Sequence, residues 1–320
     1  MNTQIEKKSK GKIFIGILGC IVPMLVFLGL QLAVGMVSGI VVAIATAAQS
    51  GSSQFASQFE YQINENIMSA MPVILLVTTL LTTIVGYLWY RLKYRERYDY
   101  QLKEVAEAKD YIYIIVAALA ASFAIDIIII FVTSIFPNAL SEYSDLMEEA
   151  GIGSNIISFL TAAFLAPIGE ECFFRGVIQR KAEKLMPFIA ANILQALLFG
   201  IMHWNIVQSS YAFVLGLILG YIRYKYQSVK MGILFHMVFN ILGQTLPMLL
   251  ANTSDTVNII LAVISVPILG IILKLMSNVE ISPKPYTEPQ PQYAYGYGQP
   301  NQGYQQPYGY GQPNQVYQQP

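Results

Sequence analysis

The chain contains two histidines, His203 and His236, and both lie within strongly apolar segments. Ionisable groups at membrane depth are costly, so their presence there points to function by default. Three short patches collect nearly all polar groups of these segments: 169–175 (GEECFFR), 199–203 (FGIMH) and 236–240 (HMVFN). Carboxylates and imidazoles can activate water, and an amide can stabilise an oxyanion, so the patches predict acid–base chemistry inside a membrane.

The first patch holds two glutamates and an arginine. On a helix, Glu171 and Arg175 lie four residues apart on one face with the acid first, which favours an ion pair. Glu170 points about 100° away around the helix and has no neighbouring cation there, as suits a general base. We therefore expect Glu170 to carry the chemistry and the Glu171–Arg175 pair to support it. The alternative is that both glutamates only neutralise Arg175 and Arg180.

The third patch places an imidazole and an amide on one helix face, because His236 and Asn240 are four residues apart. Together they can point N–H groups at one position, as an oxyanion site requires. Counted from the expected cytoplasmic helix ends, Glu170, His203, His236 and Asn240 lie roughly 12–24 Å deep at about 1.5 Å per residue. We expect them to converge on a cytoplasm-facing cavity. The alternative is that each histidine is a satisfied core residue.

The elements that must position these groups are apolar helices. A helix needs about 20 apolar residues to cross roughly 30 Å of hydrocarbon, and only helices or closed barrels satisfy the backbone there. Eight segments fit this description: 13–43, 67–90, 111–136, 156–174, 188–203, 211–224, 231–250 and 257–275. They predict an all-α polytopic membrane bundle of about eight transmembrane helices over residues 13–278.

Charge gives the expected orientation. Of the 320 residues 55% are hydrophobic and only 12% are charged, and the net charge is zero, which argues against a nucleic-acid partner. When the eight spans alternate, all 19 lysines and arginines fall on one side, as the positive-inside rule requires for a cytoplasmic side. We therefore expect a basic cytoplasmic N-terminus (1–12), a cytoplasmic C-terminus, and an interfacial helix near 138–150 on the outer face. A bacterial plasma membrane fits this asymmetry.

The C-terminal residues, 279–320, are rich in Pro, Tyr, Gln and Gly. A 13-residue unit at 295–307 recurs at 308–320 with 12 identical positions. Such a composition cannot bury a core, so we expect a disordered tail. Its aromatic and polar repeats leave a docking role open.

Three further residues, an aspartate and two cysteines, lie in or beside apolar runs. Asp126 lies in the middle of an apolar run, where we expect it to be protonated or paired with a polar group inside the bundle. Cys20 and Cys172 lie far apart in apolar stretches and are expected to be free thiols.

The three patches, in this order and on consecutive helices, resemble the EExxxR, FxxxH and HxxxN signatures of the CAAX protease and bacteriocin-processing (CPBP, or Abi) family. The resemblance covers about residues 155–245 and implies an intramembrane endopeptidase that acts on a peptide or membrane-protein substrate. It implies that Glu170 and His203 activate water, that His236 and Asn240 stabilise the oxyanion, and that Glu171 and Arg175 support the site.

Metal dependence and catalysis itself are open at this point. Glu170, His203 and His236 could offer zinc three ligands and leave a position for water. A metal-free mechanism uses the same residues and is slightly favoured. The main alternative function is a non-catalytic bacteriocin-immunity or membrane scaffold protein. A transporter is disfavoured because no internal repeat is visible in the hydropathy.

Overall fold

A computed structural model describes residues 10–49, 55–95, 99–279 and 281. The predicted basic N-terminus, apart from its last residues, and nearly all of the predicted tail with its repeat lie outside the described residues. The described residues contain helices and no strand. The α-helices are α1 (Lys10–Gln49), α2 (Phe55–Tyr90), α4 (Leu102–Val105), α5 (Ala108–Ile135), α6 (Ala139–Glu149), α7 (Ile156–Leu160), α8 (Ala166–Glu171), α9 (Arg180–Ala182), α10 (Phe188–Ile201), α11 (Ile206–Tyr226), α12 (Val229–Leu249) and α13 (Asp255–Ser277). Three π-helical segments, η1 (Arg91–Arg95), η2 (Thr161–Leu165) and η3 (Cys172–Gln179), join or extend them.

Seven helical stretches of the described chain are long and apolar enough to cross a membrane. They are Phe14–Ala48, Phe59–Arg95, Ala108–Ile135, Ile156–Ala182, Ile206–Tyr226, Val229–Leu249 and Asp255–Ser277. The all-α polytopic bundle is therefore confirmed, and the chain is an integral membrane protein. The remaining predicted span, 188–203, is the shorter apolar helix α10. Its 14 residues cover only about 21 Å at 1.5 Å per residue.

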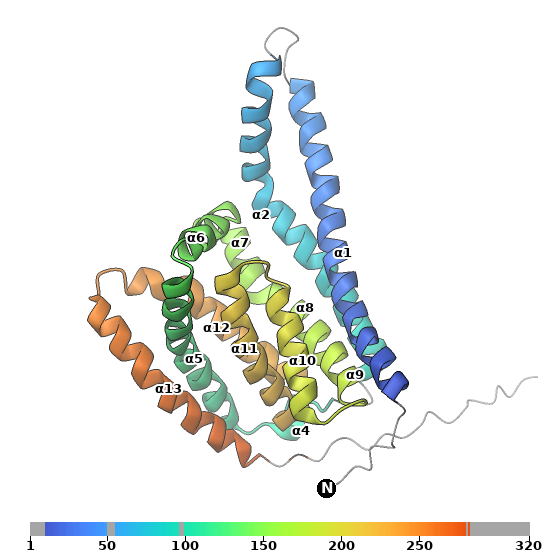
Figure 1. Cartoon of the computed structure of the whole chain (residues 1–320), viewed down its shortest axis with the longest axis vertical. Coiled ribbons are helices and arrows are strands. Elements are labelled where there is room, and N and C mark those ends of the chain that lie inside the picture. The colour runs from blue at the N-terminus through green and yellow to red at the C-terminus, as the bar shows by residue number, and fades with distance from the viewer. Residues whose placement is uncertain (1–9, 50–54, 96–98, 280, 282–320) are drawn as a thin grey trace, which may run out of the picture. The chain divides into compact units, whose positions relative to one another are not determined.

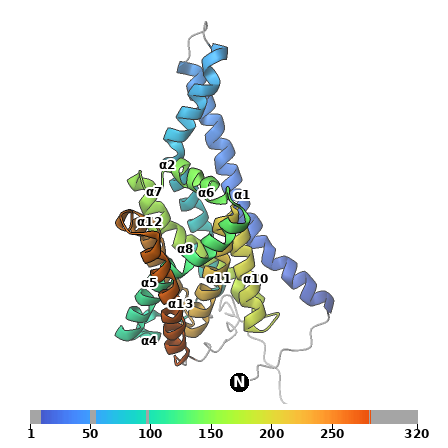
Figure 2. The same cartoon turned by 60° about the vertical axis from the view of Figure 1, so that its left-hand side comes forward.

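Some helices pack against their neighbours in the chain, and others pack against helices that are distant in sequence (Figure 1). Helix α10 packs against α11, and α5 packs against α13 and α12, as the second view also shows (Figure 2). Helix α1 packs against α2, and α2 reaches α8 and η3. The helix that carries both glutamates, Ile156–Ala182, therefore lies among α2, α10 and α12, with α1 touching its lower part.

Short polar caps fix where the last helices begin. Asn205 accepts from the backbone N–H groups of Val207 and Gln208 at the start of α11, and Ser228 and Ser254 cap α12 and α13. An N-cap of this kind satisfies backbone donors that no helical carbonyl can reach. The segment 138–150, predicted to be an interfacial helix, forms helix α6, which directly follows α5.

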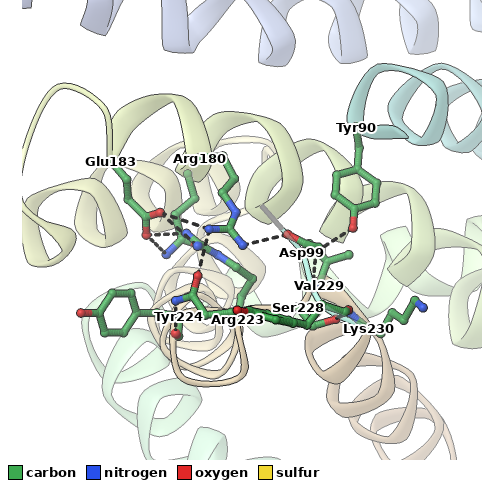
Figure 3. A network of polar contacts seen from close by, with 12 residues as sticks. Tyr90, Asp99, Arg180, Glu183, Arg223, Tyr224, Ser228, Val229 and Lys230 are labelled. Carbon is green, nitrogen blue, oxygen red and sulfur yellow. Dashed lines mark hydrogen bonds and ion pairs between the residues drawn. The ribbon is translucent and has the colours of Figure 1, made fainter. Parts of the chain in front are cut away.

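A cluster of charged side chains closes one end of the bundle (Figure 3). Arg180 Nη2 lies 2.8 Å from Asp99 Oδ1, and Arg223 Nη1 lies 3.0 Å from Glu183 Oε2. Asp99 also accepts from the Tyr90 hydroxyl at 2.6 Å. We call Asp99, Arg180, Glu183 and Arg223 the basic-end cluster. It joins the turn before α4 to α9 and α11, so the end of the bundle that is predicted to be cytoplasmic is held by buried ion pairs.

Candidate active site

The two glutamates lie where α8 ends and η3 begins. Gly169, directly before them, lets α2 approach closely: a Cβ at this position would lie 2.6 Å from Thr83 Oγ1. The helix then widens into the π-helical turns of η3, a feature that is frequent at functional sites. The sequence did not show this widening, because π-helical turns have no simple residue signature.

The predicted Glu171–Arg175 pair is confirmed. Arg175 Nη1 lies 2.8 Å from Glu171 Oε1, and both side chains are fully buried. The guanidinium also donates to the carbonyl of Gly216 at 3.3 Å and lies 4.4 Å from the centre of the Phe199 ring. These contacts give a buried cation three kinds of partner, which compensates for the water that it has lost.

The ring of His236 lies between the two glutamates. Its Nδ1 is 3.1 Å from Glu171 Oε1, and its Nε2 is 3.7 Å from Glu170 Oε2. A hydrogen bond from one imidazole nitrogen to a carboxylate fixes the ring orientation and the tautomer. Glu171 thus positions His236 as well as pairing with Arg175, a link between the first and third patches that the sequence did not reveal.

Glu171 keeps its place because Gly232 has no side chain. A Cβ on Gly232 would lie 2.9 Å from Glu171 Oε2, a buried oxygen without a hydrogen-bond partner. We expect Gly232→Ala to push the carboxylate aside and to misalign His236, because the carboxylate is the movable end of its side chain. Activity should fall by about ten- to a hundredfold, the usual cost of losing a partner that orients a histidine, while thermal stability changes little.

The matched control for this variant is Gly270→Ala. Gly270 lies in α13, and no atom lies within 4 Å of a Cβ built there. Both variants should be compared for hydrolysis and for thermal unfolding in the same detergent. Equal activity of Gly232→Ala and Gly270→Ala would show that Glu171 does not position His236.

His203 lies in the turn between α10 and α11. Its Nδ1 is 2.8 Å from the carbonyl oxygen of Phe199. A carbonyl can only accept, so Nδ1 carries the proton and Nε2 is free to accept one. The next residue, Trp204, has a φ of 56°, a left-handed conformation that is unusual for a bulky residue and that ends α10 before the histidine. Such strain is a recurring feature of functional sites.

Asn240 lies one turn beyond His236 on α12. Its Nδ2 donates to the carbonyl of Ala162 at 2.8 Å. One of its two amide N–H groups is therefore used to hold the side chain, and the other remains for a ligand.

One cavity brings the four predicted catalytic side chains together. Glu170, His203, His236 and Asn240 all line a cavity of about 230 Å³, which we call the catalytic cavity. At about 30 Å³ per water molecule it has room for several waters. Glu171 and Arg175 lie behind its wall. The grouping that the three patches predicted is present, while the role of each residue stays a prediction.

The opening of the catalytic cavity toward the cytoplasm stays a prediction, and one end of α6 contributes to the cavity wall. Met147, Ala150 and Ile152 line it, and they belong to the end of α6 and the turn after it. No member of the basic-end cluster does so. Helix α6 follows the far end of α5, so the cavity lies on the side away from the basic residues (Figure 1).

The zinc ligands considered from the sequence, Glu170, His203 and His236, stay a prediction. Among the residues that the structure describes, no group of three or more His, Cys, Asp or Glu side chains could hold a metal ion. His236 turns its Nδ1 to Glu171 and His203 turns its Nδ1 to the carbonyl of Phe199, so their Nε2 atoms are the ones left for a ligand. No step of the mechanism below is routed through zinc.

Several residues of the site were not found from the sequence. The catalytic cavity is also lined by Thr161, Phe199, Gln208 and Tyr211. Phe199 lies beside both histidines, whose rings contact it edge-on at centroid distances of 5.0 and 5.9 Å. It is the first residue of the second patch, but no role was assigned to it from the sequence. Gln208 and Tyr211 lie in no pattern and are placed only by the packing of α11.

Comparison with known proteins gives one family match. Residues 152–242 match the Rce1-like family, described as type II CAAX prenyl endopeptidase. The resemblance drawn from the three patches is confirmed. The Rce1-like segment begins just before α7 and ends within α12, so it contains all six predicted site residues. The match supports a CAAX-type intramembrane protease in general.

The walls of the site extend beyond the Rce1-like segment. Phe27 and Gln31 of α1, and Leu75, Thr79 and Thr82 of α2, line the catalytic cavity. No curated protein and no solved structure matches the chain. The free thiols expected at Cys20 and Cys172 are present, and both are buried.

Proposed function

We propose that this protein is an intramembrane endopeptidase in which Glu170 and His203 activate a water molecule within the catalytic cavity. The observation that carries the proposal is that Glu170, a His203 ring with its Nε2 free, His236 and Asn240 all line one cavity. A carboxylate and an accepting imidazole can both take a proton from water, and general base catalysis needs such a group within hydrogen-bond reach.

The reaction follows from the placement of these groups. Glu170 takes a proton from water as the water oxygen attacks the carbonyl carbon of the scissile peptide bond. The proton then passes from Glu170 to His236 Nε2, and this Nε2–H and the free amide N–H of Asn240 stabilise the oxyanion. Collapse of the intermediate breaks the C–N bond, and the proton returns from His236 through Glu170 to the leaving amine. Glu171 and Arg175 keep His236 in place throughout.

The substrate is a peptide or a segment of a membrane protein that reaches the cavity from the bilayer or from the α6 side. With the basic end toward the cytoplasm, the α6 side faces outward. A bacterial plasma membrane is the location that fits this orientation. The non-catalytic immunity or scaffold role makes the opposite prediction, namely that binding occurs without any hydrolysis.

We expect hydrolysis to survive removal of metal ions, because Glu170 can take a proton from water without a metal. Purified protein in lipid nanodiscs should cleave members of a peptide library at the same rate before and after treatment with 1,10-phenanthroline and dialysis. Elemental analysis should find less than one equivalent of zinc. Loss of cleavage on chelation and its return with zinc would overturn the metal-free mechanism, and no cleavage by untreated protein would overturn the proposed function.

A further inference from the structure

Two more cavities adjoin the catalytic cavity on the side of α6. One, of about 480 Å³, is lined by residues of α6, α11 and α12, and we call it the middle cavity. The other, of about 500 Å³, lies among α5, α12 and the start of α13, and we call it the Asp126 cavity. Tyr211 and Phe239 line all three cavities. The three spaces are thus neighbours that share walls.

Helix α12 gives the order and the length of this series. His236 and Asn240 line the catalytic cavity, Gly243 and Pro247 line both others, and Leu246 lines the Asp126 cavity. From His236 to Leu246 the helix rises roughly 15 Å at about 1.5 Å per residue. An extended peptide covers that distance in about five residues.

The walls carry buried polar atoms that have no partner. Gln244 Oε1, on the middle cavity, is buried without a hydrogen bond, while its amide nitrogen donates to the carbonyl of Asn240 at 3.1 Å. Thr161 Oγ1, on the catalytic cavity, is also buried and unpartnered. A buried polar atom left unsatisfied costs free energy, so each such case calls for an explanation. Both atoms can accept a hydrogen bond, and the backbone of an extended peptide supplies N–H donors.

The far end of the series is acidic. Asp126 lines the Asp126 cavity, and its side chain has no hydrogen bond or ion pair within the described chain. Of the two states expected from the sequence, protonated or paired with a polar group, the structure shows no polar partner. Asp255 lines the same cavity, and no Lys, Arg or His of the described residues lines it or the middle cavity. A carboxylate at this depth is stabilised by a cation, and none is supplied by the described walls.

We propose that the three cavities form one substrate channel, in which an extended peptide is cleaved beside Glu170 and anchored by a basic side chain at Asp126. The channel deepens the proposed function and rests on it. The basic residue would stand about three to six positions from the scissile bond, given the roughly 3.3 Å that each extended residue covers and the reach of a lysine or arginine side chain.

A binding experiment tests the channel without relying on hydrolysis. Glu170→Gln protein in nanodiscs is mixed with pairs of decapeptides that carry either lysine or glutamine at one defined position, and bound peptides are identified by mass spectrometry. Lysine should be enriched over glutamine by about tenfold or more at one position, as a charged hydrogen bond in a partly desolvated site allows. Adding Asp126→Asn should abolish the enrichment, whereas adding Asp145→Asn, on the exposed face of α6, should leave it unchanged.

The ratio of lysine to glutamine peptides does not depend on how much protein is folded, so a folding defect cannot imitate the expected loss. An enrichment that survives Asp126→Asn, or no enrichment at any position, would overturn the channel. If lysine is selected through Asp126 but wild-type protein cleaves none of the selected peptides, the proposed hydrolysis fails while the binding site stands.

Blocking the passage gives a second, independent test. Gly243 lines both the middle cavity and the Asp126 cavity, and no atom lies within 4 Å of a Cβ built on it. Gly243→Leu should therefore fit without disturbing the helix packing. Gly270→Leu, at an equally open position on α13, is the control. Gly243→Leu should weaken decapeptide binding about tenfold or more and leave tripeptide binding unchanged. Equal binding of decapeptides by both variants would contradict the channel.

Discussion

Replacing Glu170 with glutamine should lower kcat for peptide hydrolysis by about a hundred- to ten-thousandfold, the range that a general base contributes. The amide has nearly the same shape but cannot take a proton from water. Glu170 is the carboxylate that lines the catalytic cavity, whereas Glu171 lies behind its wall with one oxygen shared by Arg175 and His236. The rate should be measured with purified protein in nanodiscs on a peptide cleaved by the wild type.

The control for this variant is Glu142→Gln. Glu142 is an exposed residue in the first turn of α6 and lines none of the cavities near the site. It should keep wild-type activity. Both proteins should insert into the membrane and unfold at the wild-type temperature. A Glu170→Gln protein with more than a tenth of the wild-type rate would remove Glu170 from the role of general base.

The largest effect on stability is expected for Arg175→Met. The change removes the cation but leaves the fully buried Glu171 carboxylate with His236 as its only remaining partner. Breaking a buried pair by deleting one member costs about 3–5 kcal/mol. The free energy of unfolding in mixed micelles should fall by about that amount.

Removing both charges should restore much of this loss. In Glu171→Gln/Arg175→Met no unpaired charge is buried, and replacing a whole buried pair is often nearly neutral. Arg91→Met, at an exposed position after α2, should change the free energy of unfolding by less than about 0.5 kcal/mol. If Arg175→Met proves as stable as Arg91→Met, the buried cluster does not hold this part of the bundle together.

Local patterns in the sequence predicted those parts of the site that depend on local spacing. Glu171 and Arg175 are four residues apart, so any helical turn brings them together, and the structure has that pair. The apolar runs predicted the membrane helices, and the acidic run after α5 predicted α6. The order of the three patches predicted the resemblance to CAAX proteases, which the match over residues 152–242 confirms.

Features that depend on tertiary packing could not be predicted in this way. Asp99 forms an ion pair with Arg180, which lies 81 positions later in the sequence, and no local pattern near Asp99 indicates this contact. Helix α10 ends before His203 because Trp204 takes a left-handed conformation, so the hydropathy pattern overestimated its length. The lining of the catalytic cavity combines residues of α1, α2, α6, α11 and α12, a combination that no single helix specifies.

The central claim is that water, activated beside Glu170, attacks a peptide bond inside the membrane body. It is tested most directly by a single turnover of wild-type protein with a cleavable peptide in H₂¹⁸O. We expect the new C-terminal carboxylate to carry one ¹⁸O atom, and Glu170→Gln to give no labelled product in the same time. Labelled product at an equal rate from both proteins, or no product from the wild type, would contradict the account.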